Sequence, residues 1–129
     1  MGAKHLTNET SGMLDDKQVE KTVISELKNY RALKVRMENL KERERAGVKN
    51  LFPELRQSQF MNELKFTQIE RALKNSLDAI ERQIIEMKYL SPVEINDIDI
   101  YMELGLTKKR YYAKKRTAIE RLATALGII

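Results

Sequence analysis

Apolar and polar residues alternate at helical spacing along most of the chain, and the interruptions divide it into segments. Residues 15–46 contain neither Pro nor Gly, and Gly47 follows as a candidate C-cap, so one long helix is predicted over residues 14–47. Residues 1–13 carry little periodicity and are predicted to form a flexible leader. Residues 48–57 contain Pro53, which disfavours a helix at the residue before it, and they are predicted to form a linker.

The long helix carries a stripe of apolar residues at three-to-four spacing, interrupted at Glu26. The spacing is clean only in the second half of the helix, which is short for a coiled coil. Two arrangements therefore fit the pattern equally well: pairing with the same helix of a second copy, or folding back on the chain's own C-terminal domain. For a homodimer, the candidate dimerisation residues are Val23, Tyr30, Leu33, Met37 and Leu40.

The remaining residues, 58–129, show helical spacing broken by turn-forming residues, and they are predicted to form one helical domain. Asp78 with Glu81 fits the capping-box pattern that starts a helix. Thr67 with Glu70 fits it too, so a helix break near Thr67 is expected. The predicted helices cover about residues 58–74, 78–90, 96–104 and 107–126. Very little or no sheet is expected, and the predicted fold class is all-α.

A tight turn joins the last two predicted helices. Gly105 can adopt the left-handed conformation that ends a helix, Leu106 can fill the angle between the two helices, and Thr107 can cap the last one. A short amphipathic helix, a Gly turn and a capped basic helix are together typical of a helix-turn-helix. The apolar stripe expected to turn inward on the last helix consists of Tyr111, Ala118, Ile119, Leu122 and Leu126.

Positive charge is concentrated in that last helix. Residues 107–129 hold seven of the 24 Lys and Arg residues and one of the 19 Asp and Glu residues, a net charge of +6, whereas residues 1–106 have a net charge of −1. A localised cationic block favours a polyanion, because each phosphate that it neutralises releases condensed counterions. Lys114 lies near the inward stripe and is expected to reach the DNA backbone at most. The outward residues predicted to contact double-stranded DNA are Thr107, Lys108, Lys109, Arg110, Tyr112, Lys115 and Arg116.

Several other functions have little support in the composition. The chain has no Cys, and its one His is His5, so disulfides, thiolate metal sites and Cys or Ser-His-Asp catalysis are excluded, and no metal or cofactor is predicted. The acidic residues Asp97, Asp99 and Glu103 fit a helix start better than a metal site. No Gly-rich phosphate loop occurs, so no enzymatic activity is expected. No apolar run approaches a signal sequence or a membrane span, so a cytoplasmic protein without a membrane partner is expected.

The C-terminal half of the chain carries a family resemblance. The run ALKNSLDAIERQIIEMKYL, followed by LGLTKKRYYAKKRTAIERLATAL, resembles region 4 of sigma-70-type factors, in which an ER-x-I-I helix precedes a Leu-Gly turn and a basic recognition helix. The stretch MKYLSPVEINDIDIYMELGLTKKRYYAKKR is similar, more narrowly, to the ArpU family of phage and prophage transcriptional regulators. The resemblance covers roughly residues 67–128. It implies a bacterial host cell and control of late phage genes, such as those for packaging or lysis.

Three rival interpretations stay open on the sequence alone. A sigma-like factor would touch promoter DNA only with RNA polymerase as its partner. A DNA-packaging component of the small-terminase type would join a helix-turn-helix to a helical oligomerisation arm and form a ring. A helical scaffold with a basic tail would show no salt-dependent affinity for DNA. The basic helix and its turn favour a sequence-specific, DNA-binding transcriptional regulator.

Overall fold

The computed structural model describes residues 12–56 and 58–129 of the chain. Within these residues every regular element is helical and no strand occurs, which confirms the predicted all-α class. His5 and most of the predicted leader lie outside the described residues.

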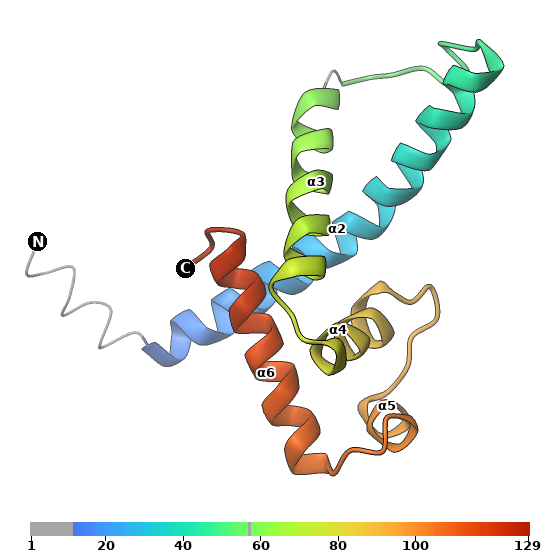
Figure 1. Cartoon of the computed structure of the whole chain (residues 1–129). Coiled ribbons are helices and arrows are strands. Elements are labelled where there is room, and N and C mark those ends of the chain that lie inside the picture. Colours follow the sequence, from blue (N-terminus) through green and yellow to red (C-terminus); the bar gives the residue numbers. More distant parts are fainter. Residues whose placement is uncertain (1–11, 57) are drawn as a thin grey trace, which may run out of the picture.

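A long first helix is followed by a group of shorter ones (Figure 1). In chain order the elements are α2 (Gly12–Ala46), α3 (Gln59–Asn75), α4 (Ala79–Ile85), the π-helical turn η1 (Glu86–Leu90), α5 (Asp97–Glu103) and α6 (Lys108–Ala125). The predicted break at Thr67 is wrong, because α3 runs through that position. Phe66 and Ile69 pack into the same core on either side of it, so the helix keeps one continuous buried face.

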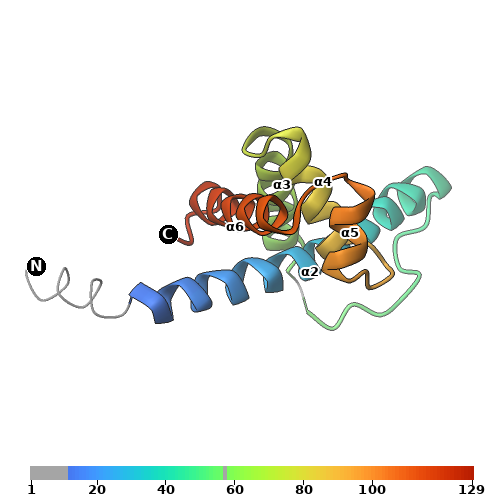
Figure 2. The same cartoon turned by 90° about the horizontal axis from the view of Figure 1, so that it is seen from below.

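The main core lies where α2 crosses the group formed by the later helices (Figure 1 and Figure 2). Val23 and Leu27 of α2 are fully buried in one cluster with Ile69 of α3, Tyr89 of η1 and Leu122 of α6. The long helix therefore folds back on the C-terminal part of its own chain. Packing within the chain avoids the loss of translational and rotational freedom on association, which costs about 4–15 kcal/mol.

This packing uses part of the stripe that contains the candidate dimerisation residues. Val23, Tyr30 and Leu33 are buried within their own chain, so they are not available as a dimer seam in this arrangement. Met37 and Leu40, farther along α2, are only half-buried. The candidate dimerisation surface is thereby reduced to the end of α2 that extends beyond the core.

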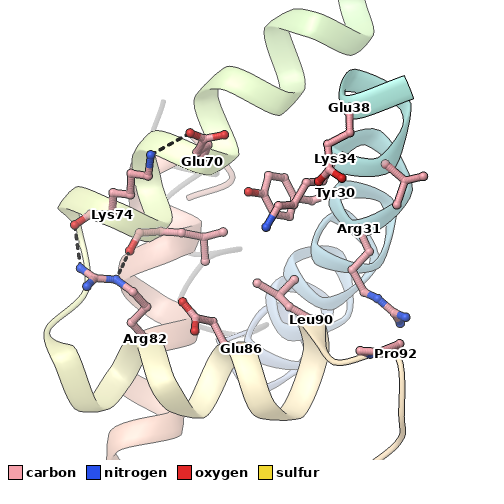
Figure 3. A pocket seen from close by; sticks show the side chains of 12 residues that line it. Tyr30, Arg31, Lys34, Glu38, Glu70, Lys74, Arg82, Glu86, Leu90 and Pro92 are labelled. Carbon is pink, nitrogen blue, oxygen red and sulfur yellow. Dashed lines mark hydrogen bonds and ion pairs between the residues drawn. The ribbon is translucent and has the colours of Figure 1, made fainter. Parts of the chain in front are cut away.

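The junction between α3 and α4 is closed by side-chain hydrogen bonds. The Asp78 carboxylate accepts from the Glu81 amide at 2.7 Å, and the Glu81 carboxylate accepts from the Asp78 amide at 2.8 Å, which confirms the predicted capping box. Arg82 donates to the carbonyls of Leu73 at 2.9 Å and Lys74 at 2.7 Å (Figure 3). Carbonyls in the last turn of a helix lack partners within it, so Arg82 satisfies the end of α3.

The α4–η1 helix separates the main core from a second, smaller one. Ile85 and Tyr89 belong to the main core, whereas Ile84 belongs to the second cluster. The π form of the last turn was not predicted from the sequence. The chain leaves the helix at Ser91, which has an extended backbone with ψ of 139°, and then reaches α5.

Candidate nucleic-acid interface

The turn between α5 and α6 is held by local hydrogen bonds. Gly105 has a φ of 68°, in the left-handed region that disfavours side chains. The Leu106 amide donates to the Tyr101 carbonyl at 2.9 Å, which reverses the chain after α5. The Thr107 hydroxyl then accepts from the Arg110 amide at 3.2 Å and caps α6. The left-handed Gly and the Thr cap were both predicted from the sequence.

The second core fixes how α5 packs against α6. Ile84 of α4, Ile100 of α5 and Tyr111 of α6 are fully buried in one cluster. Leu106 packs against this cluster from the turn, where the sequence placed it. The ring of Tyr101 lies 5.6 Å from that of Tyr111, centroid to centroid. The buried residues of α6 are Tyr111, Ala118, Ile119, Leu122 and Ala123, which include four of the five predicted inward positions, and Leu126 is half-buried.

The start of α6 presents basic side chains to solvent. Thr107, Lys108, Lys109 and Arg110 are exposed, and Arg116 is exposed about two turns farther on. The free amides of a helix N-terminus give this end a positive partial charge, which adds to the charge of the side chains. These five residues are called the cationic surface of α6 below.

Two of the predicted DNA contacts are engaged within the protein. The Lys115 Nζ lies 3.1 Å from an Asp97 carboxylate oxygen, and the Lys115 side chain is only 16% exposed. It also lies 5.6–5.9 Å from the ring centroids of Tyr89, Tyr111 and Tyr112. The Tyr112 hydroxyl donates to the other Asp97 oxygen at 3.4 Å. The spacing on α6 could not show this, because Asp97 belongs to the preceding helix.

Asp97 is the centre of a polar cluster between α5, η1 and α6. Its carboxylate accepts from the Tyr111 hydroxyl at 2.5 Å and from Lys115, and Lys88 Nζ lies 3.6 Å away. These residues, with Tyr112, are called the Asp97 cluster. From the sequence, Asp97 was expected only at the start of a helix, and no local pattern indicates the cluster.

The charge state of the cluster follows from its contacts. Burial opposes ionisation of Asp97, but hydrogen bonds from Tyr111 and Lys115 and the charges of Lys115 and Lys88 outweigh it and lower the pKa of this carboxyl. Burial, together with the hydrogen bond to Asp97, raises the pKa of Tyr111, which therefore stays a neutral donor. An ionised Asp97 thus joins α5 to α6 and neutralises Lys115.

Two further ion pairs fasten α6 to the start of α4. Lys114 Nζ lies 2.7 Å from Asp78, and Arg121 Nη1 lies 2.6 Å and 2.8 Å from the two oxygens of Glu81, which is 1% exposed. The Glu81 amide, followed by Lys114, lowers the pKa of Asp78. With Lys115, three of the seven bases in residues 107–129 are therefore paired with carboxylates of the same chain. The other four are Lys108, Lys109, Arg110 and Arg116.

The first turns of α2 border the cationic surface. A groove of about 710 Å³ is lined by Asp15, Asp16 and Glu20 of α2 and by Arg116 of α6. Lys17 and Glu120 line it too, so Arg116 lies in a groove of mixed charge in which carboxylates outnumber bases. The basic residues in the first turn of α6, Lys108, Lys109 and Arg110, do not line this groove.

A second cleft, of about 780 Å³, lies between α2, α3 and the α4–η1 helix (Figure 3). Its charged groups carry both signs: Lys74 pairs with Glu70 at 2.8 Å, and Arg82 is bound to backbone carbonyls. Burial, with Glu70 and Glu86 nearby, raises the pKa of Tyr30 on its wall. Mixed charge gives this cleft no preference for a polyanion, so α6 is the better candidate.

The chain matches no model of a protein family, no curated protein and no solved structure. The resemblance to the ArpU family and to sigma region 4 therefore stays a prediction. Among the residues that the structure describes, no helix has both the length and the apolar character needed to cross a membrane.

Proposed function

We propose that this chain is a sequence-specific, DNA-binding transcriptional regulator in which α5, the Gly105 turn and α6 act as a helix-turn-helix. The observation that carries the proposal is the cationic surface of α6: four of its five residues lie at a capped helix N-terminus, and the opposite face of the same helix is buried. A helix in this position can enter a major groove without unfolding any part of the core.

The exposed residues fit distinct tasks at a DNA duplex. Thr107 and the amides near it can bind a phosphate at the helix N-terminus, where the helix dipole favours negative charge. Lys109 and Arg110 can donate to guanine edges or to phosphates. Arg116 lies farther along the helix, beside the acidic start of α2, and fits a backbone contact at the edge of the site. Lys115 is bound to Asp97, and we assign it to positioning α6.

The resemblance to the ArpU family extends the proposal to control of late phage or prophage genes. The resemblance to sigma region 4 makes RNA polymerase a second partner to test. Both extensions depend on DNA binding, which is the first point to measure.

The test compares two double variants in titrations of a labelled DNA duplex at several salt concentrations. Lys109→Ala with Arg110→Ala removes two charges from the cationic surface. Lys28→Ala with Arg71→Ala removes two exposed charges elsewhere on the protein. If both residues bind phosphate, the first pair should weaken binding at least tenfold and reduce the slope of log affinity against log salt by about 1.8.

The matched pair should bind as the wild type does. Salt-independent affinity in the wild type, or equal losses in the two double variants, would overturn the assignment of this surface. Capture of genomic fragments by the purified chain then tests sequence specificity. Repeating the titration with RNA polymerase present distinguishes an independent regulator, which binds alone, from a sigma-like factor, which does not.

A further inference from the structure

Exposed apolar side chains are concentrated at one end of the molecule. Seven of the twelve large hydrophobic residues that are exposed in the described part of the chain lie within residues 48–64. Leu55 is 93% exposed and Phe60 72%. Monomeric proteins rarely expose contiguous apolar patches of more than a few hundred Å². The seven residues are Val48, Leu51, Phe52, Leu55, Phe60, Met61 and Leu64.

These residues lie where α2 and α3 spread apart. The rings of Tyr30 and Phe66 stack at 5.4 Å, and beyond this contact the two helices diverge toward the segment that joins them (Figure 1). A cleft of about 470 Å³ between them is lined by Met37 and Leu40 of α2 and by Glu63 of α3, among others. Three described parts of the chain are together called the fork tip: the end of α2 from Met37, residues 47–56, and the start of α3 from Gln59 to Leu64.

The joining segment is held in place by contacts with α2. Arg36 lies 3.6 Å from Glu54, and the Arg43 guanidinium lies 5.6 Å from the centre of the Phe52 ring. The segment thus contacts α2 through Phe52 and Glu54, whereas Leu55 is 93% exposed.

We propose that the fork tip is a self-association surface, and that its partner is the fork tip of a second copy of this chain. A standard stable interface buries roughly 800 Å² per partner and has an apolar centre, and the seven apolar residues of the fork tip are each between 41% and 93% exposed. Half-buried Met37 and Leu40 lie at the same end and would be covered in the same contact. Of the five candidate dimerisation residues, only these two take part.

The charges of the fork tip also fit a second copy. Residues 41–45 read Lys-Glu-Arg-Glu-Arg, and Lys49 and Glu63, which line the same cleft, continue the mixture of signs. A two-fold axis brings the same surface of both copies together, so a surface with both signs can place its bases against its own acids. A nucleic acid would instead require one sign, as on the cationic surface of α6. The fork tip lies at the opposite end of the molecule from the α5–α6 turn (Figure 1), so both surfaces can be occupied at once.

The test measures molar mass by light scattering at chain concentrations up to about 100 µM, above the micromolar Kd of a weak interface of standard size. The fork variant is Leu55→Glu with Phe60→Glu. The matched control is Val93→Glu with Met102→Glu, which adds the same charge at two residues that are also well exposed, at 67% and 71%. The wild type and the control should have twice the chain mass of 15.1 kDa, and the fork variant should have 15.1 kDa.

A monomeric wild type, a ring of many subunits, or a fork variant that keeps the double mass would each overturn the proposal. Circular dichroism verifies that the variants are folded. If the double variant loses helicity, Leu55→Glu alone applies the same test at the most exposed of these positions. The proposal does not rest on DNA binding: the Lys109→Ala with Arg110→Ala variant should keep the double mass, and loss of DNA affinity in every variant would count against α6 alone.

Discussion

Replacing Asp97 by Asn should lower the free energy of unfolding by about 2 kcal/mol more than the same change at Asp99. Both residues lie in the first turn of α5, where a carboxylate contributes about 0.3–1 kcal/mol through the helix dipole, so the comparison cancels that effect. Asp97 in addition accepts hydrogen bonds from Tyr111 and Lys115, whereas the Asp99 side chain is exposed.

The magnitude follows from these contacts. A hydrogen bond to a charged group contributes about 1.5–3 kcal/mol. The lower part of that range applies here, because Asp97 and Lys115 are 22% and 16% exposed and solvent weakens their attraction. Asn keeps one acceptor oxygen but no charge, so part of the contact with Tyr111 survives and the attraction of Lys115 and Lys88 is lost.

The assay is urea denaturation followed by circular dichroism, with linear extrapolation to water. A difference between the Asp97→Asn and Asp99→Asn variants of less than about 0.5 kcal/mol, the scatter expected at an unremarkable surface position, would refute the reasoning. The pH dependence gives an independent readout. Because the folded pKa of Asp97 is lowered, its contribution is complete above the unfolded value of about 3.9. It is lost as the pH falls through the folded value, so stability should fall less steeply with acid in Asp97→Asn than in the wild type.

Two further predictions concern other contacts of α6. Arg121→Met should lower the free energy of unfolding by about 2–3 kcal/mol, because it leaves the Glu81 carboxylate, 1% exposed, without its counter-ion. Denaturant unfolding measures this loss. A loss below about 1 kcal/mol would show that solvent replaces the ion pair. Asp16→Asn with Glu20→Gln should strengthen binding of a DNA duplex several-fold at low salt and little at high salt, because it removes carboxylates from the groove that Arg116 lines. Titration of a labelled duplex measures this change. Unchanged affinity at low salt would show that DNA does not approach this part of α6.

Residue patterns within a few positions of one another predicted the local structure well. The capping box of Asp78 and Glu81, the left-handed Gly105 and the Thr107 cap all occur where the sequence placed them. Each depends on backbone groups at most five residues away, so the chain itself supplies both partners. Helical spacing also identified the inward face of α6, because one face of a helix must be buried.

Only the tertiary structure shows which residues far apart in the sequence contact each other. Lys115 has an outward position by spacing, yet it is bound to Asp97, which lies 18 residues earlier. Glu81 is buried against Arg121, 40 residues later. An apolar stripe on α2 shows that a face must be covered but cannot show by which surface, and the fold covers its first part with the chain's own helices. Sequence alone thus determined that the chain is helical and where its positive charge gathers. Packing determined that α3 continues through Thr67 and which of those charges remain exposed.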